Sequence, residues 1–278
     1  MPTTFHSTLV DALRGVQRVD GAFGLTVDAR AEPEPTAVAA LALDDASARR
    51  WLASRQGADG GFAEHDGLVE DCASTALAAL ALDRRSAALR ALDYAVARRS
   101  PQIGESGDEN GDGRDGWGWT PDTYSWVEPT SRVLIATRVL RPGDATTRAE
   151  AVHLLEARQC PDGGWNYGNA TVNGVDLRGY AQTTAVALQA LVGSGSATVE
   201  RGLAFLRGAW RDEPGGLTLA QSLVALRLHR DRGAIGPLER ALADAHQRTH
   251  FLGNVLVLAW AVLATGPQER IDALRGGV

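Results

Sequence analysis

The feature that most constrains the fold of this chain is a repeat in which a short Gly-rich motif separates two helical segments. One copy carries RQGADGGF at residues 55–62, and a second carries RQCPDGGW at 158–165. Each motif follows a helical segment with polar residues and precedes an apolar run, Ala76–Leu82 in the first copy and Val186–Leu191 in the second. A period of this kind is typical of repeat architectures built from helix pairs.

Weaker copies of the same unit fill the rest of the chain. They cover about residues 17–43, 89–140 and 199–223, and a last copy near 235–264 lacks the Gly-Gly turn. In each copy an amphipathic helix, which exposes one face to water, precedes a helix that is apolar nearly all round and therefore buried. The pattern predicts an all-α fold, an α/α toroid of about five to six helix hairpins, with ten to twelve helices and negligible strand. An open superhelix is the alternative.

The motifs at 55–62 and 158–165 resemble the glutamine–tryptophan repeats of the terpenoid cyclase and protein prenyltransferase superfamily, found in squalene-type cyclases and prenyltransferase β subunits. The resemblance extends over roughly residues 10–265, nearly the whole chain. It implies the toroid fold and a hydrophobic, isoprenoid-like small molecule as ligand. It leaves the reaction open, because one fold hosts many functions.

The composition excludes several classes of function. All 28 basic residues are arginines, so the chain has no lysine for a Schiff base or a phosphate-binding loop. The net charge of −6 does not favour a nucleic-acid partner, since such proteins carry basic patches. We expect residues 1–278 to form a single domain, with an acidic Gly-rich insertion around 100–116.

We expect a cytoplasmic protein without a transmembrane segment. The N-terminus has neither the basic nor the apolar region of a signal peptide. The most apolar run, Phe251–Ala264, is shorter than the roughly 20 residues that a membrane-spanning helix needs. The sequence does not indicate the oligomeric state.

Polar residues recur where the inner helices should begin, and in a closed ring these ends share one rim. They are Glu34, Glu70, Asp71, Glu128, Gln182 and Gln221. Acids at this position can simply complement the helix dipole. They can also act as catalytic acids, because burial raises the pKa of a carboxyl and keeps its proton available. The four carboxyls of this set are therefore the catalytic candidates.

Aromatic residues gather near Glu128 and in the following repeat. With Gln182, they are the candidates for substrate binding: Trp119, Tyr124, Trp126, Tyr167 and Tyr180. Aromatic ring faces stabilise a nearby positive charge. Carboxyls beside an aromatic surface thus suit acid-assisted cyclisation or rearrangement, a reaction that requires no cofactor.

The superfamily resemblance makes this reaction the leading hypothesis, with departures. The segment VEDCA at 69–73 is similar to the Asp-rich motif of class II terpene cyclases and keeps two adjacent acids, but Leu68 replaces the first aspartate. A non-catalytic toroid that binds a lipid-like ligand or a protein is one alternative. A degenerate zinc-dependent prenyltransferase is another.

Two metal sites can be weighed from the sequence. The prenyltransferase resemblance makes Cys72 a candidate zinc ligand, but Glu128 and Gln182 occupy the positions comparable to that of the expected histidine. Residues 108–113 match the opening of a calcium loop, although Trp119 occupies the twelfth position where a glutamate belongs. The simpler interpretation is that Cys72 only packs in the core and that residues 108–113 belong to a solvated acidic insertion. We therefore expect no resident metal.

The aromatic residues that end the Gly-Gly turns have a structural rather than a chemical role in this interpretation. Phe62 and Trp165 should wedge between neighbouring outer helices and stabilise the ring.

Overall fold

The chain is described by a computed structural model over residues 2–65, 68–69, 71–100, 116–120 and 123–276. Its helices are α1 (Pro2–Gly15), α2 (Pro33–Leu43), α3 (Ala46–Arg55), α4 (Cys72–Ala81), α5 (Arg85–Ala97), α6 (Val127–Leu140), α7 (Ala145–Ala157), α8 (Ala181–Ala190), α9 (Ala197–Ala209), α10 (Gly216–Leu228), α11 (Ile235–Thr249), η1 (His250–Gly253), α12 (Val255–Thr265) and α13 (Gln268–Ala273). The strands are β1 (Thr171–Val172) and β2 (Val175–Asp176), which pair antiparallel.

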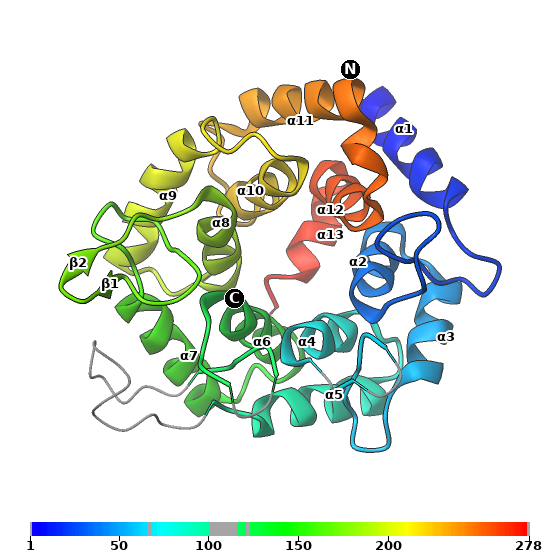
Figure 1. The fold of residues 1–278 in the computed structure, drawn as a ribbon, viewed down its shortest axis with the longest axis horizontal. Coiled ribbons are helices and arrows are strands. Elements are labelled where there is room, and N and C mark those ends of the chain that lie inside the picture. The colour runs from blue at the N-terminus through cyan, green and yellow to red at the C-terminus, as the bar shows by residue number, and fades with distance from the viewer. Residues whose placement is uncertain (1, 66–67, 70, 101–115, 121–122, 277–278) are drawn as a thin grey trace.

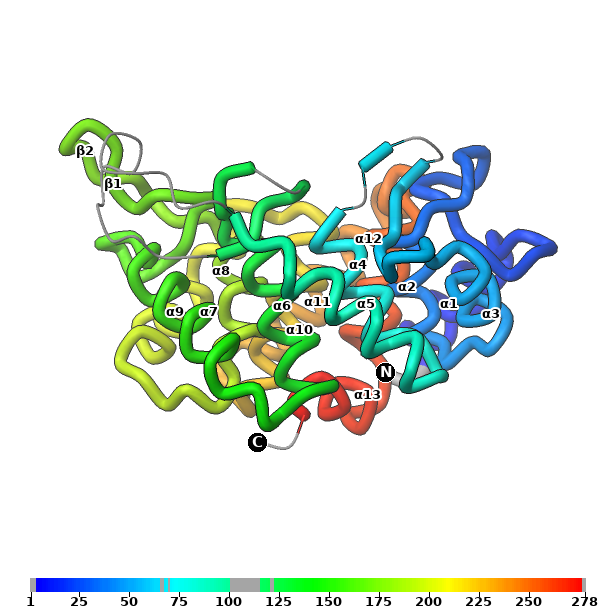
Figure 2. The backbone as a smooth tube through the Cα atoms, turned by 90° about the horizontal axis from the view of Figure 1, so that it is seen from below, coloured from blue at the N-terminus to red at the C-terminus, as the bar shows by residue number. Residues whose placement is uncertain are grey.

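The helices form two concentric rings (Figure 1). Even-numbered helices α2 to α12 make the inner ring, in which each packs against the next, and α12 packs against α2 to close it. Odd-numbered helices α1 to α11 lie outside. The all-α toroid is therefore confirmed, and the open superhelix is ruled out. The described residues form one more α-helix than the ten to twelve that were expected. The additional helix is α13, which follows the last repeat and lies at the end of the ring opposite to the β1–β2 hairpin (Figure 2).

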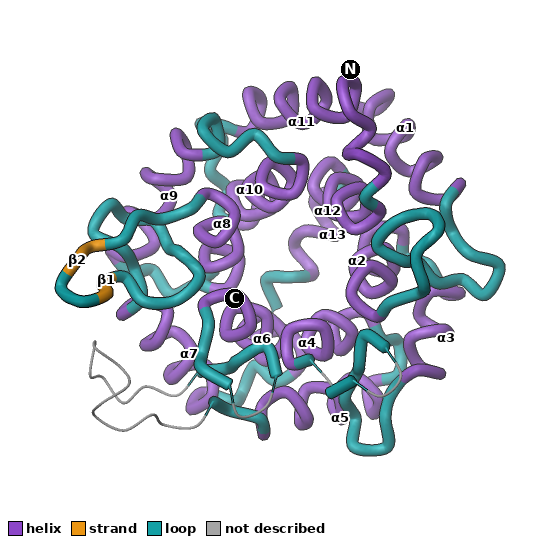
Figure 3. The backbone as a smooth tube through the Cα atoms, viewed as in Figure 1, coloured by secondary structure: helices purple, strands orange, loops and turns teal. Residues whose placement is uncertain are grey.

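Burial follows the sequence pattern of the two rings. Outer helix α11 buries one stripe, Leu238, Leu242 and Ala245, at the spacing of a helix with one face in water. Inner helix α2 buries nine of its eleven residues and begins with Pro33, whose missing N–H is harmless in a first turn. Figure 3 shows that, outside the β1–β2 hairpin, loops connect the helices of the described chain.

The Gly-rich turns of the repeat share one set of hydrogen bonds. In the motif at 158–165, the Gln159 amide donates to the Gly163 carbonyl at 2.8 Å, and the Asp162 side chain accepts from the Gly164 N–H at 3.0 Å. Gly163 has φ +92°, a conformation that favours glycine. The motif at 55–62 forms the same bonds through Gln56 and Asp59. The residue types shared by the two motifs therefore form the same turn, which leads the chain from the outer to the inner ring.

A threonine in each of the first four inner helices ties the turn to the helix that follows. Its hydroxyl accepts a hydrogen bond of 2.8–3.1 Å from the N–H of the turn's aromatic residue. The pairs are Thr36 with Phe23, Thr75 with Phe62, Thr130 with Trp117 and Thr184 with Trp165. Each threonine is the fourth residue of its helix, so these bonds set where each inner helix begins relative to the turn.

The turn aromatics are buried as expected. Phe62 and Trp165 are both 0% exposed. The Trp165 indole donates from Nε1 to the Leu155 carbonyl of α7 at 2.6 Å, and its ring lies against Gly202 of α9, where a Cβ would come within 2.6 Å of it. Trp165 thus fills the space between two neighbouring outer helices, and no side chain larger than that of glycine fits at Gly202 without a shift.

The fifth and sixth repeats depart from this plan. Helix α10 begins directly at the Gly-Gly turn, with Gly215 as its N-cap. Gln221, expected at the start of this helix, therefore lies in its second turn. Before α12, His250, Phe251 and Leu252 replace the glycine turn and adopt left-handed backbone angles, with φ between 45° and 54°.

Candidate active site

The inner helices begin at one rim of the ring, and their first residues carry the candidate acids. Glu34, Glu128 and Gln182 are each the second residue of their helix, in α2, α6 and α8. Asp71 stands slightly earlier, as the N-cap of α4. Three neighbouring inner helices thus present carboxyls at this rim. Glu70, the remaining candidate, lies outside the described residues.

Asp71 combines the two roles that the sequence left open. Its carboxylate accepts a hydrogen bond from the Ser74 N–H at 2.6 Å, as a helix N-cap does. Burial nevertheless raises the pKa of Asp71 to about 6, and the charge of Glu128 raises it further against the opposing hydrogen bonds from Ser74 and Ala73. The cap hydrogen bonds favour the ionised carboxylate, so the raised pKa reflects burial first and the charge of Glu128 second.

Among the described acids at the rim, Glu34 has the largest pKa shift. Burial raises its pKa to about 8, and the negative charges of Glu128, Glu64 and Asp71 add to the shift, while Arg132 opposes it. Its side chain stays partly exposed. A carboxyl of this kind keeps its proton at neutral pH, which is the state required of a general acid.

Glu64 belongs to the same cluster and was not identified from the sequence. Burial raises its pKa to about 7, and Asp71 and Glu32 raise it further, whereas the nearby Ser74 hydroxyl lowers it. Both carboxyl oxygens are buried, and neither makes a hydrogen bond of good geometry within the described chain. The sequence feature that could have identified Glu64 is its position two residues after the turn aromatic Phe62, in the loop that leads to α4.

Glu128 differs from the other acids of the rim in having a cationic partner. It forms an ion pair with Arg132, one turn further along α6, at 3.0 Å. Arg132 is 1% exposed, and its guanidinium lies over the Trp260 ring of α12 at 4.8 Å. Because α6 and α12 are opposite members of the inner ring, this contact spans the centre of the ring below the acids. Arg132 thus links Glu128 on one side of the ring to Trp260 on the other.

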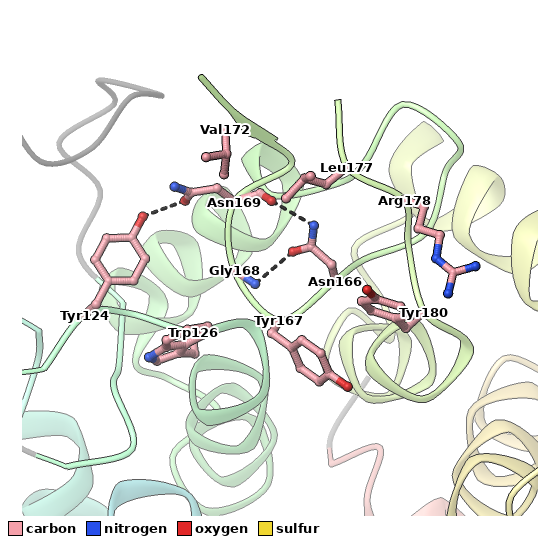
Figure 4. Close-up of a pocket in the computed structure, with 10 residues that line it drawn as sticks. All are labelled: Tyr124, Trp126, Asn166, Tyr167, Gly168, Asn169, Val172, Leu177, Arg178 and Tyr180. Atoms are coloured by element: carbon pink, nitrogen blue, oxygen red, sulfur yellow. Dashed lines mark hydrogen bonds between the residues drawn. The ribbon is translucent and has the colours of Figure 1, made fainter. Parts of the chain in front are cut away.

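The aromatic residues form a separate pocket beside this cluster. It has a volume of about 380 Å³ and lies over the starts of α6 and α8 (Figure 4). Four of the predicted substrate-binding residues line it, namely Tyr124, Trp126, Tyr167 and Tyr180. The Tyr167 carbonyl accepts from the Val127 N–H at 2.9 Å, so the loop that carries this tyrosine is fixed to the start of α6.

The other two predicted substrate-binding residues lie outside the pocket lining. Trp119 is 42% exposed, and its carbonyl accepts from the Cys72 N–H at 2.9 Å, so it lies beside the start of α4. Gln182 donates to the Gln221 side chain at 2.9 Å, joining α8 to α10. The structure therefore brings Trp119 close to Asp71, and Gln182 close to Gln221.

The metal hypotheses receive little support. Burial raises the pKa of the Cys72 thiol to about 12, which disfavours the thiolate that binds zinc. Within the described ranges, no three His, Cys, Asp or Glu residues are grouped closely enough to hold a metal ion. The calcium-like segment 108–113 lies outside the described residues.

Comparison with solved structures shows a terpene-cyclase-like fold. A protein from Actinoplanes is 16% identical with a TM-score of 0.64, and the match covers 98% of this chain and 100% of that one. The type II terpene cyclase MstE from Scytonema is 14% identical with a TM-score of 0.64, over 98% of each chain. A variant of MstE in complex with its substrate, geranylgeranyl dihydroxybenzoate, matches with a TM-score of 0.59 at 14% identity, over 98% of this chain and 97% of that one.

No protein-family model and no curated protein sequence matches this chain. At 14–16% identity, the structural likeness shows the fold and leaves the chemistry to the residues. In the described part of the chain, none of the helices is both long and apolar enough to cross a membrane.

Proposed function

We propose that this protein is an enzyme that cyclises or rearranges a hydrophobic, isoprenoid-like substrate by acid-assisted chemistry. The observation that carries the proposal is the Glu34 carboxyl, whose pKa is raised to about 8 within a cluster of acids at the rim of the toroid. We further propose that residues 1–278 form one domain, since the first and last inner helices, α2 and α12, pack together.

In this mechanism, protonated Glu34 or Asp71 donates its proton to a carbon–carbon double bond of the substrate. The proton forms a new C–H bond with the electron pair of the double bond, and the adjacent carbon becomes positively charged. Attack by a second double bond closes a ring, and loss of a proton from the final cation gives a product that is an isomer of the substrate. The product therefore has the substrate's mass, and no redox partner is needed.

The remaining groups stabilise positive charge in this scheme. Glu128, in its ion pair with Arg132, would supply a negative charge near the proton donor. Such preorganised charges act strongly where water is excluded. Trp119, whose backbone lies beside the start of α4, is the aromatic residue that we propose stabilises a nearby cation. We assign the proton to Glu34 or Asp71 because their pKa values are raised to about 8 and about 6.

The comparison with MstE supports the choice of substrate class, because that cyclase binds a geranylgeranyl-bearing molecule and has the same fold. The experiment is incubation of the purified protein in D₂O with geranylgeranyl dihydroxybenzoate, geranylgeranyl diphosphate and squalene. We expect from at least one of them a cyclised isomer that carries one deuterium at the carbon first protonated. Recovery of all three unchanged, with the protein folded, would argue against the cyclase function.

A second candidate is a toroid that binds a hydrophobic ligand without reaction. The contact between Arg132 and Trp260 favours it, because it fills the centre of the ring and limits the depth to which a long chain can enter. Native mass spectrometry of the purified protein tests this candidate. A co-purifying isoprenoid that is never converted would support binding and contradict catalysis.

A further inference from the structure

The aromatic pocket contains polar groups of two kinds, those that hold the loop together and those that remain available. Asn166 donates to the Asn169 carbonyl and accepts from the Gly168 N–H, both at 2.8 Å. The Tyr124 hydroxyl donates to the Asn169 side chain at 2.5 Å. These three side chains fix the shape of the pocket (Figure 4). They are therefore part of its frame.

Arg178 is the cation among the residues that line the pocket, and it is available to a ligand. Its side chain is exposed and forms no ion pair with the described residues. Its guanidinium lies over the Tyr180 ring at 5.1 Å, on the side of the pocket opposite to Tyr124 (Figure 4). An arginine held in this way presents its N–H edge to a carboxylate, which it can bind through two hydrogen bonds.

The walls of the pocket are flat. Tyr167 and Tyr180 lie 5.3 Å apart between ring centroids at an interplanar angle of 33°, and the Trp126 ring lies beside Gly168, where a Cβ would be in contact with it at 3.5 Å. Aromatic surfaces of this kind favour planar ligands, which stack on or against them. Val172 and Leu177 add apolar surface at the open side.

We propose that this pocket binds a planar head group with a single carboxylate, carried by the isoprenoid-like substrate, with Arg178 as the residue that recognises the carboxylate. This inference rests on the proposed function for the identity of the apolar chain. A single available arginine matches one negative charge, which fits a monocarboxylate better than a diphosphate. Trp126 joins the two regions, since it lines the pocket and is the N-cap of the helix that carries Glu128. The apolar chain would therefore run along the rim toward the acids.

The test is a binding measurement that needs no turnover. The probes are 3-geranyl-4-hydroxybenzoate and its methyl ester, which have the same chain and ring and differ in charge. We expect the acid to bind about three- to tenfold more tightly than the ester, the range that one partly exposed charged contact supplies. Arg178→Gln should reduce the affinity for the acid to that for the ester and leave the ester unchanged. Isothermal titration calorimetry measures both.

Arg211→Gln is the matched control, because Arg211 also lies over an aromatic ring, that of Trp210 at 4.4 Å, and does not line the pocket. It should not change either affinity. Equal binding of acid and ester to the wild type, or an equal loss in both arginine variants, overturns the head-group site. Turnover of a neutral isoprenoid without any preference for the acid would leave the cyclase function standing and remove this inference. Binding of the acid through Arg178 without turnover would leave the head-group site standing and remove the cyclase function.

Discussion

Two parts of the rim, each formed by neighbouring inner helices, carry different chemistry. The acidic half comprises the starts of α2, α4 and α6, with Glu34, Asp71 and Glu128. The amide half comprises α8 and α10, with Gln182 and Gln221. In the amide half a neutral hydrogen bond of 2.9 Å joins the two side chains. In the acidic half, burial raises the pKa of Glu34 and Asp71 and the charge of Glu128 adds to both shifts, while Glu128 itself pairs with Arg132.

The comparison separates structure from function at these positions. If an acid were needed to start an inner helix, Gln182 would not serve at the position that Glu34 and Glu128 occupy in their helices. Leu217 and Leu256, the second residues of α10 and α12, show that not even a polar residue is required there. Burial, with the charges of neighbouring acids, raises the pKa of Glu34, and strongly perturbed pKa values are typical of functional sites, so the acidic half is where a functional role is expected.

The largest expected effect is loss of turnover when the acidic half is neutralised. Glu34→Gln and Asp71→Asn keep the side-chain shape and remove the acidic proton, and Asn still caps a helix. We expect at least one of them to lower kcat about 10²–10⁴-fold, the usual contribution of a general acid, with the fold retained. The measurement is steady-state kinetics with the substrate identified by the incubation in D₂O, and circular dichroism checks the fold of each variant.

Gln182→Ala in the amide half is the control for this prediction. It removes the hydrogen bond to Gln221 and no acidic proton, so kcat should stay within about threefold of the wild type, since a neutral partly exposed contact contributes little. Full activity in both acid variants would mean that the carboxyls act only on helix stability.

The second effect concerns a feature in which the two halves agree. Phe62 precedes the acidic half and Trp165 the amide half, and both are fully buried next to a threonine that accepts from their N–H. Trp165→Ala should lower the free energy of unfolding by about 3–5 kcal/mol, as truncation of a buried Trp or Phe does. Urea unfolding measures it. An unchanged midpoint would show that Trp165 is not part of the packed core.

The agreement between these turns explains why the fold could be predicted from the sequence. The turn and the start of the inner helix depend on hydrogen bonds and a backbone conformation that only certain residue types allow. These residues are Gln159, Asp162, Gly163 and Thr184, so the repeated motif predicts both features. The short helix α13 has no counterpart in the repeat, and this is why it was missed. Gln221 was misplaced because the turn before α10 lacks the usual loop.

The site could be predicted only in part, because its chemistry arises between repeats. The positions of Glu34, Asp71 and Glu128 follow from the repeat. Glu128 alone of these three pairs with Arg132, and Arg132 also contacts Trp260 on the opposite inner helix, 128 positions further along the chain. Glu64 joins the cluster from a loop with no periodic signal. Local sequence patterns do not contain such contacts.

A third effect appears in the pH dependence of stability. The folded protein raises the pKa of Glu34 from 4.5 to about 8, so the folded state binds this proton more tightly than the unfolded state does. Stability from this group is complete below pH 4.5 and is lost as the pH rises through 8. Glu34→Gln removes the ionisation and should therefore become more stable relative to the wild type between about pH 5 and about pH 9. Urea unfolding at both pH values measures the change, and a difference independent of pH would contradict it.

The smallest expected effect comes from moving an acid into the amide half. Gln182→Glu places a carboxyl at the same position in α8 that Glu34 has in α2. It gains the attraction of a helix N-terminus and loses the hydrogen bond to Gln221, so the free energy of unfolding should change by less than about 1 kcal/mol. Turnover should stay within about twofold, because position 182 contacts Gln221 of α10 rather than the acids. The double variant Glu34→Gln/Gln182→Glu sharpens the comparison, since it keeps the number of acids and changes only their place. We expect it to remain as inactive as Glu34→Gln alone. Recovered turnover would show that any acid at the rim suffices, and the distinction between the two halves would then lie in charge number rather than in position.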